Sequence, residues 1–256
     1  MCYDTNARPP MPPSDGGTAH GHDIVLTTAD GSPFAAYTAV PEGTKPAARV
    51  IILPDVRGVH GFYKDLAVRF AEQGIAAVAI DYFGRTAGLT DRDDAFEFMP
   101  HVQQMRFDTF SSDVDAALAY HHEGVPTDLP TFTMGFCMGG ALSLKTATRE
   151  LPLSGAIGFY AGLSRDIGGG GTVLEQAMRI RYPVLGLFGG ADSHIPQAEV
   201  DTLDRELDNA GVEHELVVYP GAPHSFFDRQ SAAYADASAD AWTRVLDFIG
   251  NHASRA

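Results

Sequence analysis

Three residues of this chain have side chains that could act together as nucleophile, base and acid: Cys137, His224 and Asp192. Catalysis by a thiol needs a base that takes its proton and a third group that orients the base. Cys137 stands in the sequence Gly-Phe-Cys-Met-Gly-Gly at residues 135–140. This is the pattern G-x-C-x-G, a nucleophile elbow with sulfur in place of oxygen. It predicts acyl transfer through the thiol, and a buried structural cysteine in a glycine-rich turn is the alternative.

The segments on either side of Cys137 are expected to hold it on a tight turn. Residues 130–134 form an apolar run of strand length, and residues 141–147 have a helical pattern. A turn from strand to helix leaves little room for side chains, so glycines are expected on both sides of the cysteine. Amide groups at a helix N-terminus favour a thiolate, and the N–H of Met138 is the expected first donor of an oxyanion hole.

The acid and the base each follow a later strand. Asp192 comes after the apolar run 183–188, and His224 comes after the run 214–219. Parallel strands present their carboxyl ends at one edge of the sheet, where ligands bind. The chain order of nucleophile, acid and histidine is also the order of the α/β-hydrolases. We therefore predict that Cys137, Asp192 and His224 form a catalytic triad.

Two other residues compete for these roles. His194 could serve as the base, but it shares a loop with Asp192. This choice would also give the loop of His224 no catalytic role. Asp81 follows the strand 75–80 and could serve as the acid. A structural role, or shaping the loop that carries Arg85, is the preferred interpretation of Asp81.

The loop 54–61 follows another apolar strand and is expected to complete the site. The N–H of Val56 is the predicted second oxyanion donor. Asp55 is expected near the thiol, where a carboxylate raises the pKa of the cysteine and favours its neutral form. Two cations, Arg85 and Arg229, stand in loops at the same edge. Because arginine binds a carboxylate with two hydrogen bonds, we predict that they hold an anionic substrate, with a surface salt bridge as the alternative for Arg229.

Composition narrows the class of protein. The 256 residues include 45% hydrophobic residues and carry a formal net charge of −15, which argues against nucleic acid as a partner. We expect no membrane span, no signal peptide and thus a cytoplasmic location. The two cysteines make a disulfide framework improbable, and the histidines outside the site form no zinc pattern. We expect no metal and no cofactor.

The order of expected elements defines the fold. Strand-length apolar runs alternate with helical patterns from residue 49 onward, which is typical of a parallel sheet with helices on both faces. Before them, the strands 23–28 and 33–40 flank Asp30-Gly31, a hairpin signal. We expect residues 1–22 to form a Pro/Gly-rich arm and residues 23–256 a single domain of the α/β-hydrolase fold, with antiparallel strands at its N-terminus.

With these motifs in view, the chain resembles the dienelactone hydrolases, or carboxymethylenebutenolidases, from about residue 23 to its end. The most specific matches are the hexapeptide 135–140, Gly-Ala-Asp at 190–192, and Pro-His-Ser-Phe at 223–226. The resemblance implies the same triad and oxyanion donors, a substrate-carboxylate arginine at Arg85, and a substrate contact at Ser225.

The chain departs from the family pattern at two positions. Asp55 replaces the glutamate of the family's well-known member and is one methylene shorter. The family's second carboxylate-binding arginine aligns with Asp228, and Arg229 stands one residue later. In addition, Arg57 adds a cation beside the oxyanion loop.

The expected function is hydrolysis of a small, anionic lactone or ester through a thioester on Cys137, without nucleic acid or membrane, by a monomer or small homo-oligomer. The resemblance implies conversion of a dienelactone to maleylacetate in the degradation of aromatic compounds. One alternative is a carboxylesterase or thioesterase of broad specificity. Another is a ligand-binding protein that has kept the fold without turnover.

Overall fold

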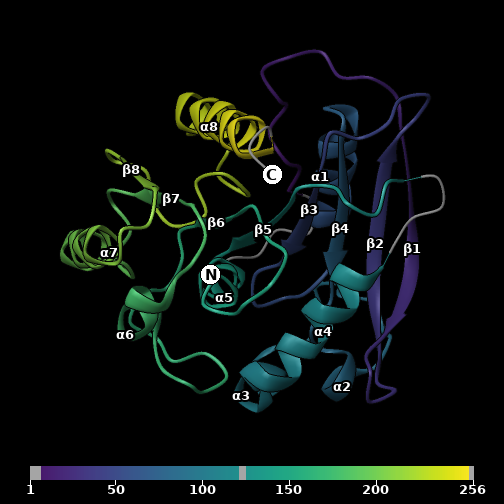
Figure 1. Cartoon of the computed structure of the whole chain (residues 1–256), viewed down its shortest axis with the longest axis horizontal. Coiled ribbons are helices and arrows are strands. Elements are labelled where there is room, and N and C mark those ends of the chain that lie inside the picture. Colours follow the sequence, from purple (N-terminus) through teal and green to yellow (C-terminus); the bar gives the residue numbers. More distant parts are fainter. Residues whose placement is uncertain (1–6, 121–124, 254–256) are drawn as a thin grey trace.

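A single eight-stranded sheet forms the centre of the molecule (Figure 1). The computed structural model describes residues 7–120 and 125–253. The strand order is β1-β2-β4-β3-β5-β6-β7-β8, and all neighbouring pairs from β4 to β8 are parallel. The strands are β1 (Ala19–Thr27), β2 (Pro33–Pro41), β3 (Ala48–Leu53), β4 (Ile75–Ile80), β5 (Thr131–Phe136), β6 (Gly155–Phe159), β7 (Val184–Gly189) and β8 (His214–Tyr219).

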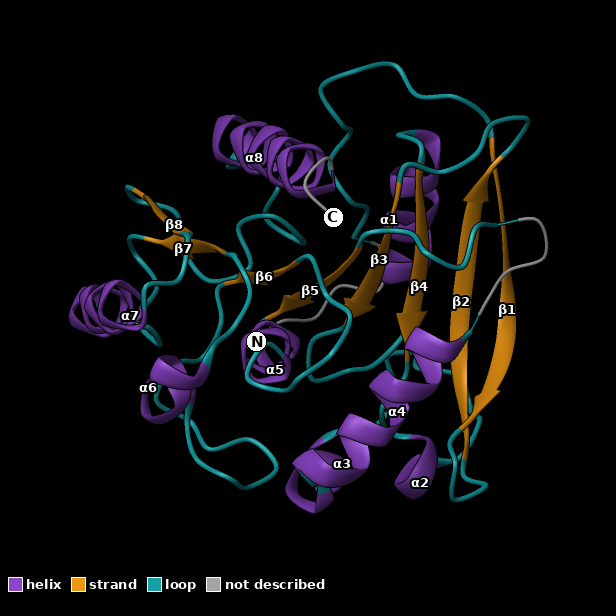
Figure 2. Ribbon diagram, viewed as in Figure 1, coloured by secondary structure: helices purple, strands orange, loops and turns teal. Residues whose placement is uncertain are grey.

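Helices cover both faces of this sheet (Figure 2). Alternate residues of β3 point to opposite sides: Val50 and Ile52 pack in a core with α1 and α8, whereas Ile51 and Leu53 pack with α4 and part of α5. The helices are α1 (Gly61–Glu72), α2 (Gly84–Ala87), α3 (Met99–Gln104), α4 (Phe107–Ala119), α5 (Met138–Thr146), α6 (Val173–Gln176), a 3₁₀ turn (Ala177–Arg179), α7 (Gln197–Ala210) and α8 (Ala235–Ala253). This arrangement confirms the expected α/β-hydrolase fold.

The expected N-terminal hairpin is present. The strands β1 and β2 pair in antiparallel fashion, and β2 adds to β4 antiparallel as well. Gly31 has φ of +84°, a left-handed conformation that glycine adopts without strain. The strand β1 begins at Ala19, four residues before the expected start, because its first residues extend the same ladder to Pro41. The end of the segment assigned to the arm is therefore part of the sheet.

Residues 7–17 run over α1 and α8. The indole Nε1 of Trp242 donates to the Pro10 carbonyl oxygen at 2.8 Å, and the Gly17 N–H donates to Glu72 O on α1 at 2.8 Å. Trp242 is fully buried, and its ring lies 4.9 Å from that of Phe70, centroid to centroid, so it is part of the core. Cys2, His121 and His122 lie outside the described residues. Within the described ranges, no helix combines the length and apolar character needed to cross a bilayer.

Candidate active site

The turn at Cys137 has the strained geometry of a nucleophile elbow. Cys137 stands between β5 and α5 with φ of 54° and ψ of −111°, values that a residue with a Cβ seldom adopts. A Cβ at Gly135 would overlap with the Gly139 backbone, and a Cβ at Gly139 would overlap with the carbonyl oxygens of Leu53 and Pro54. The glycines of the motif are therefore required by the close approach of three backbone segments.

The same geometry places the Cys137 thiol at the N-terminus of α5. Cys137 is the N-cap residue of this helix, its side chain is partly exposed, and no acidic residue lies in the first helical turn. The first N–H groups of a helix have no acceptor within it, and they favour an anion. The N–H of Met138, the first residue of α5, thus has the place expected of an oxyanion donor.

His224 and Asp192 meet through a short hydrogen bond. The His224 Nδ1 lies 2.6 Å from the Asp192 Oδ2, and the second carboxylate oxygen accepts the His194 N–H at 2.9 Å. Asp192 is almost completely buried. Its carboxylate therefore fixes the orientation of the His224 ring and leaves Nε2 for proton transfer.

The two competing residues have other contacts. The carboxylate of Asp81 forms an ion pair with Arg92 at 2.7 Å, and both side chains are buried. The ring of His194 stands edge-on to that of His224 with centroids 5.7 Å apart, while its backbone N–H holds Asp192. Asp81 is thereby a structural ion-pair partner, as preferred from the sequence.

Three buried tyrosines surround the site, and sequence reasoning missed them. Tyr160, which follows β6, has φ of 36°, packs on the His224 ring with centroids 4.9 Å apart, and donates to Asp228 at 3.0 Å. Tyr63 accepts the N–H of Asp55 at 2.9 Å, and Tyr82 donates to the carbonyl oxygen of Asp55 at 2.6 Å. Their positions in the sequence could have indicated two of them, because Tyr82 and Tyr160 stand one or two residues after the end of a strand.

Asp55 lies in this cluster beside the elbow. It is 2% exposed, and its Oδ1 accepts the N–H of Arg57 at 2.9 Å. Burial, and after it the charges of Asp55, Asp81 and Cys137, raises the pKa of Tyr82 well above its ordinary value. The charges of Asp55 and of Cys137 both act on the Tyr82 hydroxyl, and the role of Asp55 beside the thiol stays a prediction. Val56 continues the same loop and is partly buried against the core cluster that contains Met138.

The structure places the predicted substrate-binding residues in different surroundings, and Arg85 lies apart from the loop of His224. Arg85, on α2, forms ion pairs with Asp30 at 2.8 Å and Asp113 at 3.5 Å, so its guanidinium is held by the hairpin and by α4. The sequence around Arg85 gave no sign of these partners, because they come from distant segments. The structure therefore gives its substrate-binding role no support.

Ser225 and Arg229 lie in the loop of His224. Ser225 is fully buried with φ of 63°, and its Oγ has no hydrogen-bond partner among the described residues. Arg229 is partly buried, and its backbone N–H donates to Asp228. The carboxylate of Asp228 stands where the resemblance would put an arginine. The roles of Ser225 and Arg229 in substrate binding stay predictions.

No group of three or more possible metal ligands occurs in the part of the chain that the structure describes. The chemistry available at this edge of the sheet is that of the thiol, the imidazole and the surrounding N–H groups. A strand-to-helix cysteine, a histidine and a buried carboxylate on this fold define a hydrolase of the α/β-hydrolase class.

The chain belongs to the dienelactone hydrolase family, whose model matches residues 34–253. A protein of Yersinia pestis described as "Putative carboxymethylenebutenolidase" is 30% identical over 242 residues, which cover 91% of this chain and 90% of the relative. A relative from Saccharolobus solfataricus with the same description is 30% identical over 259 residues, covering 88% and 96%. The protein is accordingly a carboxylic ester or lactone hydrolase.

Solved structures support the same fold. A structure from Klebsiella pneumoniae, described as "Putative Dienelactone Hydrolase", superposes with a TM-score of 0.77 at 26% identity and covers 90% of this chain and 99% of that one. The dienelactone hydrolase-like promiscuous phosphotriesterase P91 has a TM-score of 0.75 at 23% identity, covering 92% and 99%. At that identity the second likeness concerns the fold alone.

Proposed function

We propose that the protein hydrolyses a small lactone or ester through a thioester on Cys137. His224 takes the thiol proton, the sulfur attacks the carbonyl carbon, and the N–H groups of Met138 and Val56 hold the oxyanion. The leaving alkoxide departs with the proton from His224. His224 then activates water, which attacks the thioester and releases the acid and the thiol. The observation that carries this proposal is the 2.6 Å bond between His224 and Asp192 at the edge where Cys137 caps α5.

The resemblance and the relatives' description point to a dienelactone as the substrate and maleylacetate as the product, in the breakdown of aromatic compounds. This substrate is anionic. Of the two arginines predicted to bind the substrate, Arg229 is the one that would receive its carboxylate, because Arg85 is held by two carboxylates. The proposal for an anionic lactone therefore depends on the family and on Arg229.

A second candidate is hydrolysis of neutral esters as a carboxylesterase of broad specificity. Three observations favour it: Arg85 is engaged by Asp30 and Asp113, and two buried carboxylates, Asp55 and Asp228, lie around the tyrosine cluster. Buried carboxylates disfavour a second anion in the same space. A neutral ester avoids this cost.

The test compares turnover of a dienelactone with turnover of 4-nitrophenyl acetate. The variants are Cys137→Ala and, as a matched control, the same change at the other cysteine, Cys2→Ala. Loss of both activities in Cys137→Ala alone would support the thiol mechanism. Efficient lactone turnover by the wild type would favour the anionic substrate, and turnover of the aryl ester alone would favour the second candidate. Full activity of Cys137→Ala would overturn the mechanism.

A further inference from the structure

Tyr160 contacts the base of the triad from a strained position in the backbone. It is the first residue after β6, is fully buried, and has φ of 36°, which a residue with a Cβ seldom adopts. Its N–H donates to the carbonyl oxygen of Leu187 on β7 at 2.7 Å, and the neighbouring Phe159 carbonyl oxygen accepts the N–H of Cys137 at 3.0 Å. The backbone at Tyr160 is thus fixed both to the elbow and to β7. Strain of this kind persists only where the surrounding contacts hold it.

The Tyr160 ring limits the movement of the His224 imidazole. The two rings pack with centroids 4.9 Å apart and an interplanar angle of 56°. The bond from His224 Nδ1 to Asp192 fixes one atom of the imidazole, but a hydrogen bond tolerates a range of angles and leaves the ring able to tilt. His194 also contacts the imidazole, but it is exposed and therefore less restrained. The buried Tyr160 ring is the contact that can set the position of Nε2, the atom that exchanges protons.

The Tyr160 hydroxyl holds the loop that carries His224. It donates to Asp228 Oδ2 at 3.0 Å, and the second carboxylate oxygen of Asp228 accepts the N–H of Arg229. Asp228 is itself buried, and its N–H donates to the Ser225 carbonyl oxygen at 3.3 Å. Burial, and after it the charge of Asp228, raises the pKa of Tyr160 well above its ordinary value, so the hydroxyl keeps its proton and this bond. The loop is thus attached to the end of β6 through the Tyr160 side chain.

Packing alone does not explain this hydroxyl. The Tyr160 ring also contacts the aromatic core, with the Phe136 centroid at 6.1 Å and the Phe226 centroid at 5.8 Å. A phenylalanine would fill the same space without burying a hydroxyl and a carboxylate, and the burial of both is costly. Because Tyr160 is 0% exposed, it does not touch the substrate. Its role in the reaction is therefore one of position, exerted through His224.

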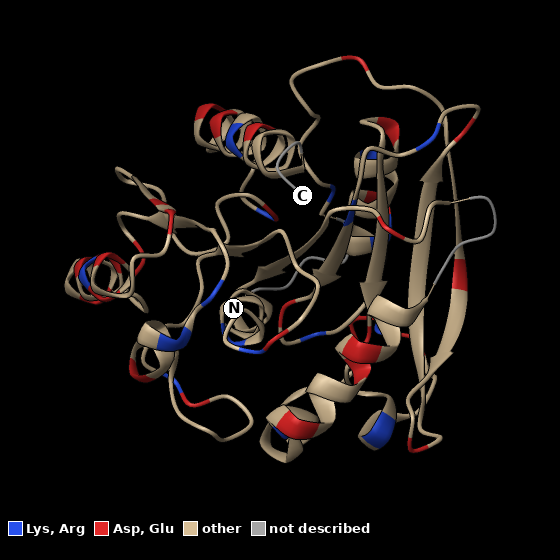
Figure 3. Ribbon diagram, viewed as in Figure 1, with Lys and Arg blue, Asp and Glu red and all other residues tan. Residues whose placement is uncertain are grey.

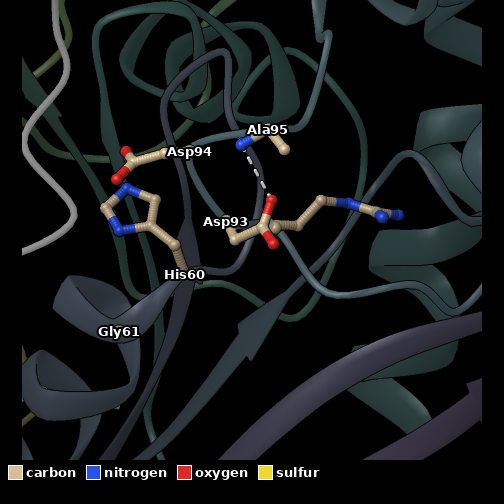
Figure 4. Close-up of a pocket in the computed structure, with 6 residues that line it drawn as sticks. His60, Gly61, Asp93, Asp94 and Ala95 are labelled. Carbon is tan, nitrogen blue, oxygen red and sulfur yellow. Dashed lines mark hydrogen bonds between the residues drawn. The ribbon is translucent and has the colours of Figure 1, made fainter.

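The pocket at the start of α1 has no lining residue in common with this contact or with the triad (Figure 4). It is lined by His60, Gly61 and the segment 92–95. The His60 ring stands edge-on to that of Tyr63, with centroids 4.8 Å apart, and Tyr63 is fully buried. The pocket is thus separated from the elbow by buried side chains, whereas Tyr160 contacts the base directly.

We propose that Tyr160, together with Asp228, is a positioning residue for His224. Its ring sets the tilt of the imidazole, and its hydroxyl holds the His224 loop at the end of β6. The inference rests on the proposed function, in which His224 takes the thiol proton and later activates water. It adds that both proton transfers depend on the bond between Tyr160 and Asp228.

The first experiment measures kcat and KM for 4-nitrophenyl acetate. Tyr160→Phe keeps the ring and removes the hydroxyl, so kcat should fall about tenfold, the factor that one hydrogen bond of 1.4 kcal/mol provides, while KM stays within about twofold. Asp228→Ala should cause the same loss, and the double variant should be no slower than either single variant. Asp228→Asn should keep most of the activity, because its amide can donate to the Tyr160 oxygen.

Tyr182→Phe is the matched control for the loss of a hydrogen-bonded hydroxyl. The Tyr182 hydroxyl accepts the N–H of Leu151 at 2.8 Å, and Tyr182 lies before β7, at the opposite end of the strands from the site. Its kcat should equal that of the wild type.

A second measurement asks whether the effect passes through His224. Alkylation of Cys137 by iodoacetamide at pH 7.5, followed by mass spectrometry, reports how readily the thiol gives up its proton and needs no turnover. Tyr160→Phe should slow this reaction about fivefold in the wild-type background, but by less than about twofold once His224→Ala has removed the base.

Three results would overturn the positioning role: unchanged kcat in Tyr160→Phe, equal kcat in Asp228→Ala and Asp228→Asn, or an effect of Tyr160→Phe on alkylation that is undiminished by His224→Ala. If Tyr160→Phe does not fold, as judged by circular dichroism, the two Asp228 variants decide. Failure of the thiol mechanism would show separately, as full ester turnover by Cys137→Ala.

Discussion

The bond between Asp192 and His224 decides how the imidazole is used. Asp192→Asn would keep the size of the side chain but lose the charge that orients the ring, so kcat for 4-nitrophenyl acetate should fall by about 10³–10⁴-fold. Asp201→Asn on α7 is the matched control, because Asp201 is exposed and its carboxylate accepts a surface hydrogen bond from Gln197 at 2.8 Å. Steady-state kinetics at pH 7.5 would check this. A loss of less than tenfold would mean that Asp192 is not the orienting acid.

The buried ring of His60, the residue before α1, makes the stability of the fold depend on pH. Its pKa is lowered to about 4 by burial and Arg57, whereas the carboxylate of Asp94 opposes this effect. The unfolded chain takes up a proton near pH 6.5 and the folded protein does not, so stability falls as the pH drops from about 6.5 towards 4. From pH 7.5 to 5 this residue should account for about 2 kcal/mol of the loss.

Urea unfolding of the wild type and of His60→Gln at the two pH values would measure this difference. The variant should lose about 2 kcal/mol less than the wild type on acidification. His20→Gln, at an exposed position of β1, should behave like the wild type. Parallel losses in all three proteins would show that the His60 ring is protonated in the folded state.

At the scale of elements, the contact between the first turn of α5 and the end of β3 leaves no space for a side chain. Gly139→Ala would push a Cβ into the carbonyl oxygens of Leu53 and Pro54, so we expect loss of the elbow and at least a hundredfold lower activity. Gly250→Ala on α8 has nothing within 4 Å and should stabilise the protein by about 1 kcal/mol. Thermal unfolding and ester kinetics of the pair separate the two effects. A fully active Gly139→Ala would contradict the close packing.

The helix α4 carries a buried carboxyl whose charge opposes folding. Burial raises the pKa of Asp113 to about 7, and Arg85 only partly offsets the effect. Because the folded protein keeps this proton and the unfolded chain does not, the stability contributed at low pH is lost as the pH rises through about 7. Between pH 5 and 8 the loss should be about 2–3 kcal/mol, and Asp113→Asn should not show it.

Chemical unfolding of wild type and Asp113→Asn at pH 5 and pH 8 checks this prediction. Asp115→Asn is the control on the same helix, since Asp115 is exposed and pairs with Arg149 at the surface. Equal pH dependence in all three proteins would mean that Arg85 keeps Asp113 ionised in the folded state.

For the whole molecule, sequence patterns predicted the sheet, the main helices and the meeting of Asp192 with His224, because each depends on local periodicity or on the position of a strand end. They did not predict the contacts of Arg85, whose partners Asp30 and Asp113 are 55 and 28 residues away in the chain. The short helices α2, α3 and α6 were also missed, since four to six residues carry too little periodic signal. Side-chain partners between distant loops arise only when the fold brings the loops together.

The net charge of −15 makes a further prediction about the substrate. Acidic residues lie on α4, α7 and α8 and on several loops (Figure 3), so the field of the molecule repels an anion on its way to the site. Salt screens this repulsion, with a Debye length of about 30 Å at 0.01 M and about 8 Å at 0.15 M. We therefore expect kcat/KM for an anionic lactone to rise roughly 2- to 5-fold over this range of salt. For a neutral aryl ester it should stay constant. A fall with salt for the lactone would contradict this prediction and would show that cations at the site attract the substrate more strongly than the net charge repels it.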